Sequence, residues 1–211
     1  MFGAAVHRLI ATAASKRFVE RHNGTDRNEM PSNSLLRWQT DRVPRLNALD
    51  AQVASGPPSA LADENLRALV AMLCAHFQGF CRDLYSESVE SVVRTFPPGM
   101  GLVARTQFMA QIGLGTGNPT LQTLVRDFDR FGVGVRAALD ADPANAVRLN
   151  HLALLNQWRN FVVHHGVTAP PGPALAPALP QVWQVSCGGL AAELDRIMYD
   201  YLQALLGTPP W

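Results

Sequence analysis

The stretch ADENLRALVAMLCAHFQGFCRDLYSESVESVVRT, residues 62–95, decides the fold. It contains no proline and repeats its apolar residues at helical spacing, so it predicts one long amphipathic helix. Asp63 and Glu64 place negative charge in the first turn, where the helix macrodipole favours it. The secure apolar positions of its stripe are Leu69, Leu73, Phe77, Phe80, Leu84 and Val92.

Helical periodicity dominates the rest of the chain as well, and strand patterns are nearly absent. The further helices that we expect span residues 4–21, 34–53, 103–112, 120–139, 143–164 and 190–206. The sequence therefore predicts an all-α helical bundle built around one very long helix.

Proline and glycine mark the expected interruptions of these helices. Pro44 should kink or restart the second helix, and the GPPS run at 56–59 should end it. The PPG run at 97–99 should end the long helix. The GLGTG run at 113–117 is expected to be a loop between helices, because no strand precedes it and no Gly-Lys-Ser/Thr follows it as in a phosphate loop.

The last part of the chain changes in composition. Residues 168–180 are rich in proline and alanine and predict a tether, and residues 181–185 are expected to be a short extended piece before the final helix. The organisation that we expect has three regions: an N-terminal helical region over 1–55, a core over 61–166, and a tether with a C-terminal helix packing on that core over 167–211.

Composition bounds the class of protein. A chain of 211 residues is long enough for one sizeable core, and 47% hydrophobic with 17% charged residues is typical of a globular protein. The net charge of +1 excludes a global attraction to nucleic acid or membranes, so any anion binding has to be local. Of the 18 basic residues, all but Lys16 are arginine.

The cysteines and the N-terminus indicate a reducing compartment. Cys74, Cys81 and Cys187 are odd in number and lack metal-ligand spacing, so we expect buried core thiols, no disulfide framework and no metal or other cofactor. Residues 1–18 contain basic side chains and resemble an amphipathic helix rather than a signal peptide. No apolar run approaches the roughly 18 residues that span a bilayer. We therefore expect a cytoplasmic protein that does not enter the membrane.

The chemistry of the chain concentrates in WRNFVVHHG, residues 158–166. Between 149 and 167 there is no carboxylate, and Arg159 is the only fixed charge. One row of the expected helix carries polar side chains at i, i+4 and i+8: Asn156, Asn160 and His164. The opposite face, which we expect to be buried, carries Leu154, Trp158, Phe161 and Val162.

These residue types are the parts of a metal-independent RNA cleavage site. Arg159 offers a forked cation for a phosphate, His164 can transfer a proton near neutral pH, and Asn160 can orient either group. One chain supplies one such imidazole, whereas two copies of the helix facing across a two-fold axis supply an acid and a base. His165 is a second candidate imidazole, but it lies nearer the expected buried side than His164.

A structural interpretation of the same residues stays open at this point. Ion-pair networks imitate functional sites. In that interpretation the arginine pairs with Asp83, Glu87 or Glu90, and His164 caps a backbone carbonyl.

The run RNFVVH at 159–164 matches the Arg-x4–6-His motif of the HEPN domains (higher eukaryotes and prokaryotes nucleotide-binding), with the frequent asparagine after the arginine. Residues 69–84 resemble the long helix that precedes the motif helix in these domains, and residues 112–118 resemble a loop of their ribonuclease-associated prokaryotic branch. The resemblance covers roughly residues 61–166.

The resemblance implies a homodimeric four- to five-helix domain and a metal-independent endoribonuclease that leaves a 2′,3′-cyclic phosphate. It implies catalytic roles for Arg159, His164 and Asn160, and it points to a toxin or phage-defence effector with an antitoxin protein as a partner. The auxiliary candidates are Asn156, His165 and Gln78. Many relatives carry an acidic residue near the position of Gln78, and the His-x-Tyr ending of some toxins is missing here.

Two other classes of function remain open on the sequence alone. The chain could be a catalytically inactive HEPN-like module that binds a nucleotide, RNA or a partner protein, since the near-neutral charge offers little for gripping a long RNA. It could also be a structural helical protein whose final helix docks on a neighbour.

Overall fold

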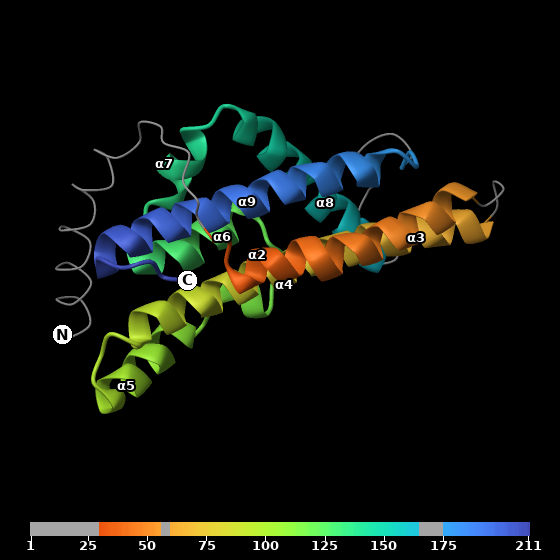
Figure 1. Cartoon of the computed structure of the whole chain (residues 1–211). Helices are drawn as coiled ribbons and strands as arrows, with labels where there is room; N and C mark the ends of the chain where they lie inside the picture. The colour runs from red at the N-terminus through yellow and green to blue at the C-terminus, as the bar shows by residue number, and fades with distance from the viewer. Residues whose placement is uncertain (1–29, 56–59, 165–174) are drawn as a thin grey trace.

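The computed structural model describes residues 30–55, 60–164 and 175–211. Within these ranges all regular structure is helical, which confirms the predicted all-α bundle (Figure 1). The expected helix over 4–21, the break at 56–59, the residues His165 and Gly166, and most of the tether lie outside the described residues. The longer helices are α3 (Val43–Ser55), α4 (Ala60–Val93), α5 (Pro98–Met109), α8 (Ala144–Val163) and α9 (Leu179–Leu206).

Short elements connect these helices. Before α3 lie α2 (Asn33–Arg37) and a π-helical turn, η1 (Trp38–Arg42). Between α5 and α8 lie the 3-10 turn η2 (Gly113–Gly115), α6 (Leu121–Phe128), the 3-10 turn η3 (Asp129–Phe131) and α7 (Val135–Asp140).

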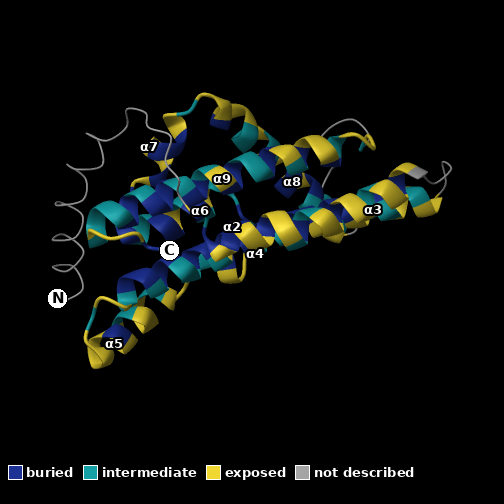
Figure 2. Cartoon of the chain, in the orientation of Figure 1, coloured by how far each residue is buried: buried dark blue, intermediate teal, exposed yellow. Residues whose placement is uncertain are grey.

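α4 is the long helix that the sequence predicts, and it is the centre of the bundle. Figure 1 shows it running along most of the molecule, with α3 along its first half and α5 beside its last turns. α8 and α9 pack on α4 and on each other. All of the expected apolar positions of α4 are buried, and the stripe begins one turn earlier than expected, at Leu66. Figure 2 shows the exposed residues on the outer face of α3 and at the end of α5.

The expected interruption at Pro44 is confirmed. Pro44 has no N–H to donate to a carbonyl of the preceding turn, and that turn is the π-helical η1, which separates α2 from α3. η1 is anchored to α4 by Trp38, which is buried and whose ring contacts those of Phe77 and Phe80 at centroid distances of 5.9 and 6.0 Å.

The prediction of a single helix over 120–139 is wrong. α6 and η3 end at Gly132, whose φ is 88°, and α7 starts after Gly134, whose φ is 69°. Left-handed backbone of this kind favours glycine and cannot continue a right-handed helix, so the chain turns between the two glycines.

Two helix starts also differ from the prediction. α5 begins at Pro98 rather than at 103, because proline suits the first turn of a helix, where its missing N–H has no intrahelical partner. The extended piece expected at 181–185 is wrong, since these residues belong to α9. Its buried positions Pro180, Trp183, Cys187 and Leu190 follow helical spacing.

The three cysteines are buried and free, as expected. Burial raises the pKa of the Cys74 thiol to about 11 and raises those of the other two as well. Within the described part of the chain, every helix is too short or too polar to serve as a membrane span.

Candidate functional site

α8 carries the polar row and Arg159. It begins at Ala144, one residue later than expected, and the Oδ1 of Asp142 accepts a hydrogen bond from the Ala144 N–H at 2.9 Å. From the sequence we expect Asp142 as the N-cap and Pro143 as the first helical residue, whereas in the structure Pro143 is the N-cap and Asp142 lies one residue before it. The helix ends at Val163 and is capped by His164, whose backbone N–H donates to the Asn160 carbonyl at 3.0 Å.

The apolar face of α8 is shifted from the predicted one. Trp158 is buried and Phe161 is half-buried, but Leu154 is 38% exposed, which makes the prediction for this leucine wrong. Leu152 and Leu155 are buried instead. The buried face differs from the predicted one because α8 packs against both α4 and α9, so the residues that face either of these two helices are covered.

Asn156, the first member of the polar row, lies in the core and is 5% exposed. Its Oδ1 accepts from the Cys74 Sγ–H at 3.4 Å, and its Nδ2 donates to the Pro119 carbonyl at 3.3 Å and to the Leu152 carbonyl at 2.9 Å. This amide connects α8 with α4 and with the segment before α6. Its contacts are those of a structural residue, since a buried polar group needs such partners.

Asn160 lies one turn further along and contacts a residue that the sequence did not single out. Its Oδ1 accepts from the Nδ2 of Asn118 at 2.8 Å and from the Nη1 of Arg159 at 3.2 Å. Because both neighbours are donors, the oxygen of the carboxamide has to face them. The Nδ2 of Asn160 has no acceptor among the described residues and remains available to a ligand oxygen.

Arg159 is half-buried, and no carboxylate of the described residues lies within ion-pair distance of it. The pairing that the structural interpretation assumed is wrong. Asp83 pairs with other arginines, Glu87 accepts hydrogen bonds from the start of α2, and Glu90 pairs with Arg105. Among the described residues, one of the five guanidinium N–H groups of Arg159 has an acceptor, the Oδ1 of Asn160.

The charge of Arg159 influences Cys74, a residue of α4. Burial raises the pKa of the Cys74 thiol, and the positive charge of Arg159 partly offsets this effect by lowering it. The guanidinium therefore lies close to a neutral, buried thiol rather than to an acid.

His164 is exposed, and its imidazole has no hydrogen-bond partner among the described residues. The expectation that its side chain caps a carbonyl is wrong, because the cap bond is made by its backbone N–H. The imidazole is one turn beyond Asn160, and its exposure is what contact with a ligand or a second molecule requires. His165, the other candidate imidazole, lies outside the described residues.

Gln78 acts on the loop rather than on Arg159. Its Nε2 donates to the Leu114 carbonyl at 3.0 Å, while the Leu114 N–H donates to the Oδ2 of the buried Asp127 at 2.7 Å. The run at 113–117 is thus a helix connection, as predicted, and it is fixed to both α4 and α6. Held in this way, the chain continues to Asn118 and brings it onto Asn160.

Within two turns of one helix, the arrangement combines a cation, an amide N–H₂ without an acceptor in the described chain, and an exposed imidazole. Across the described ranges, no three His, Cys, Asp or Glu residues gather as metal ligands. Comparison of the chain with family models, with curated proteins and with solved structures finds no match.

Proposed function

We propose that the protein is an endoribonuclease of the HEPN type, which cleaves RNA without a metal ion at a site shared by two copies of α8 in a homodimer. The observation that carries this proposal is Arg159, a half-buried cation without a carboxylate partner in the described chain, held beside the Asn160 amide and one turn from an exposed imidazole. Arginine in this state suits a phosphodiester group.

In the proposed reaction, His164 accepts the proton of a ribose 2′-OH, and the 2′-oxygen forms a bond to the adjacent phosphorus. The bond from phosphorus to the 5′-oxygen breaks, and that oxygen receives a proton from His164 of the partner subunit. Arg159 stabilises the charge that develops on the phosphoryl oxygens. The products are a 2′,3′-cyclic phosphate and a 5′-hydroxyl end.

The pairing of two copies is part of the proposal, because the described residues of each chain supply one imidazole at this site, that of His164, and the reaction needs an acid and a base. An isologous interface places the same helix opposite itself, so the two histidines and the two arginines would share one site. In a cell, such an activity fits a toxin or a phage-defence effector that an antitoxin protein holds in check.

The experiment is a cleavage assay on single-stranded RNA in excess EDTA with the parent protein, His164→Ala and Val163→Ala. Val163 is exposed next to the histidine, so its variant controls for disturbance of the helix end. We expect the parent and Val163→Ala to cleave with cyclic-phosphate ends and His164→Ala to be inactive. Equal cleavage by His164→Ala would contradict the proposal.

A second candidate is a binding module without catalysis. Arg159 and the free amide of Asn160 can hold an anion without any proton transfer, and Gln78, near where many of the resembling domains carry an acid, is engaged with the Leu114 carbonyl. RNA binding by the parent without cleavage under any condition would favour this candidate.

A further inference from the structure

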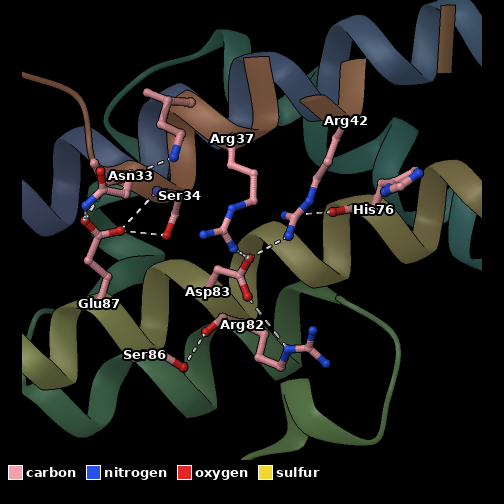
Figure 3. A network of polar contacts seen from close by, with 11 residues as sticks. Asn33, Ser34, Arg37, Arg42, His76, Arg82, Asp83, Ser86 and Glu87 are labelled. Atoms are coloured by element: carbon pink, nitrogen blue, oxygen red, sulfur yellow. Dashed lines mark hydrogen bonds and ion pairs between the residues drawn. The ribbon is translucent and has the colours of Figure 1, made fainter. Parts of the chain in front are cut away.

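A second group of arginines surrounds Asp83 on α4 (Figure 3). The Oδ2 of Asp83 accepts from the Nη2 of Arg42 at 2.5 Å and from the Nη1 of Arg37 at 3.0 Å. The Nε of Arg82 lies 4.0 Å from the Oδ1. Three guanidinium groups therefore share one carboxylate.

The positive charge of this group is not balanced within the described chain. Arg37, Arg42 and Arg82 have no other carboxylate within ion-pair distance among the described residues. Glu87 is one turn along α4, but its carboxylate is already engaged by the backbone and side-chain donors of Asn33 and Ser34 at the start of α2. There it offsets the partial positive charge of that helix end.

The three arginines differ in accessibility. Arg42 is 10% exposed; its guanidinium lies against Gly79, where an added Cβ would come within 3.3 Å of it, and it also donates to the His76 carbonyl. Arg37 and Arg82 are 57% and 52% exposed. Arg42 therefore neutralises Asp83 from its buried side, whereas Arg37 and Arg82 present their remaining donors to solvent.

Two members of this group, Arg82 and Asp83, lie on α4, which also carries residues that contact the proposed catalytic site. Gln78, which binds the loop leading to Asn118, is one turn before Arg82 on α4. Cys74, which the Arg159 charge affects, precedes Arg82 by two turns, or about 12 Å along the axis. Arg82 also lies about 80° around the axis from Cys74, so a strand of several nucleotides that runs along the helix and partly around it would join the two places.

We propose that Arg37 and Arg82 bind phosphodiester groups of the single-stranded RNA that extends from the Arg159 site. The proposal rests on the proposed function, since it takes RNA as the ligand. The guanidinium fork matches the oxygens of a phosphate, and the near-zero net charge of the chain makes such local groups the means of holding a polyanion.

The test is the salt dependence of binding to a 2′-O-methyl RNA 12-mer, which lacks the free 2′-OH needed for cleavage. Fluorescence anisotropy would follow the full-length parent and the double variant Arg37→Gln, Arg82→Gln from low to moderate salt. Each lost contact to a single strand lowers the slope of log K against log salt by about 0.7, so we expect a slope smaller by about 1.4 and roughly 25-fold weaker binding at 0.1 M salt.

The matched control removes the same number of charges. Arg45 and Arg136 are exposed to a similar degree, 65% and 57%, and each pairs with its own carboxylate one turn away, Asp41 and Asp140. Arg45→Gln with Arg136→Gln should leave the slope within the error of the parent. Arg82→Gln alone keeps both bonds to the Oδ2 of Asp83 and should lower the slope by about 0.7, which guards against a folding defect in the double variant.

An equal fall in the double variant and in the control would overturn the proposal, as would an unchanged slope or a parent that does not bind the 12-mer. The proposed function is tested separately, by cleavage. Arginine-dependent binding without cleavage of ordinary RNA would remove the nuclease and leave the phosphate site, whereas cleavage with an unchanged slope would remove the phosphate site alone.

Discussion

Arg42 and Arg159 both belong to helical elements that pack on α4, and they differ in every partner. Arg42 is buried, pairs with Asp83, donates to a backbone carbonyl and lies against a glycine. Arg159 is half-buried, contacts one amide oxygen and lies near the Cys74 thiol. Cys74 and Asp83 are nine residues apart, which places them on opposite faces of the helix, about 180° around it.

The comparison separates two uses of arginine. A buried cation that joins helices is surrounded by a carboxylate and backbone acceptors, as Arg42 is, and removing it leaves its partner uncompensated. A cation that serves a ligand keeps most of its donors unused until the ligand arrives; we propose this use for Arg159, for which one hydrogen bond, to Asn160, is found in the described chain. The two residues should therefore respond to mutation in opposite ways.

The largest effect is expected for Arg159→Ala. Loss of the cation facing the phosphoryl group should lower the rate of RNA cleavage by about 10³-fold, whereas the free energy of unfolding should change by less than about 1 kcal/mol. Arg159→Lys should also impair cleavage, because an ammonium does not reproduce the planar fork. Cleavage kinetics and urea unfolding on the same preparation check this, and a lysine variant as active as the parent would show that charge alone suffices.

Arg42→Ala should show the reverse pattern. It leaves Asp83 with the exposed Arg37 as its remaining close partner, so the free energy of unfolding should fall by about 3 kcal/mol. Arg45→Ala removes an exposed pair with Asp41 and should cost less than about 0.5 kcal/mol. Urea unfolding of both variants tests the difference, which would disappear if the Asp83 group contributed nothing to packing.

Asn118→Asp should have a smaller effect on activity. An aspartate cannot donate to the Oδ1 of Asn160, so the carboxamide has to turn its N–H₂ toward the new acceptor and Arg159 loses its bond. We expect cleavage to slow by about tenfold, mainly in kcat, with little change in the unfolding midpoint. Gln122→Ala, an exposed change nearby in α6, is the control. A parent-like kcat in Asn118→Asp would show that this contact does not position the site.

The smallest effect that we expect is a change of stability with pH, which arises from His76 on α4. Burial lowers the pKa of His76 below its ordinary value of 6.5, and the charges of Arg42 and Arg45 lower it further. The charge of Asp41 acts in the opposite direction but is the weakest of these effects. The unfolded chain then binds a proton more readily than the folded one, so this contribution to stability is present above pH 6.5 and is lost as the pH falls below it.

We therefore expect the melting temperature of the parent to fall more between pH 7.5 and 5.5 than that of His76→Gln. Differential scanning calorimetry at the two pH values measures this difference. Identical falls in parent and variant would show that His76 titrates alike in the folded and unfolded chain.

The architecture was predictable from the sequence where periodicity is strong. Residues 62–95 carry one apolar stripe over many turns, and α4 follows it closely. The helix over 120–139 was not predictable as two pieces, because a glycine within a helical pattern is often tolerated and the positive φ of Gly132 and Gly134 depends on tertiary packing. The start of α9 was missed because its prolines and glycines weaken the local pattern.

The candidate site was predictable in part. Spacing places Asn156, Asn160 and Arg159 on one helix, and the structure shows this arrangement. Spacing does not indicate that Asn156 is buried against Cys74, nor that Asn118 reaches Asn160 from 42 residues away. Nor does it show which arginines pair with Asp83, since that choice depends on how α2 and η1 lie on α4.

The most direct test of the account is the RNA cleavage rate of Arg159→Gln in excess EDTA, measured on a preparation whose urea unfolding midpoint has been determined. The account predicts an unfolding midpoint close to that of the parent and cleavage reduced at least about 100-fold. A variant that cleaves like the parent but unfolds several kcal/mol more easily would contradict it, because Arg159 would then be a structural cation like Arg42.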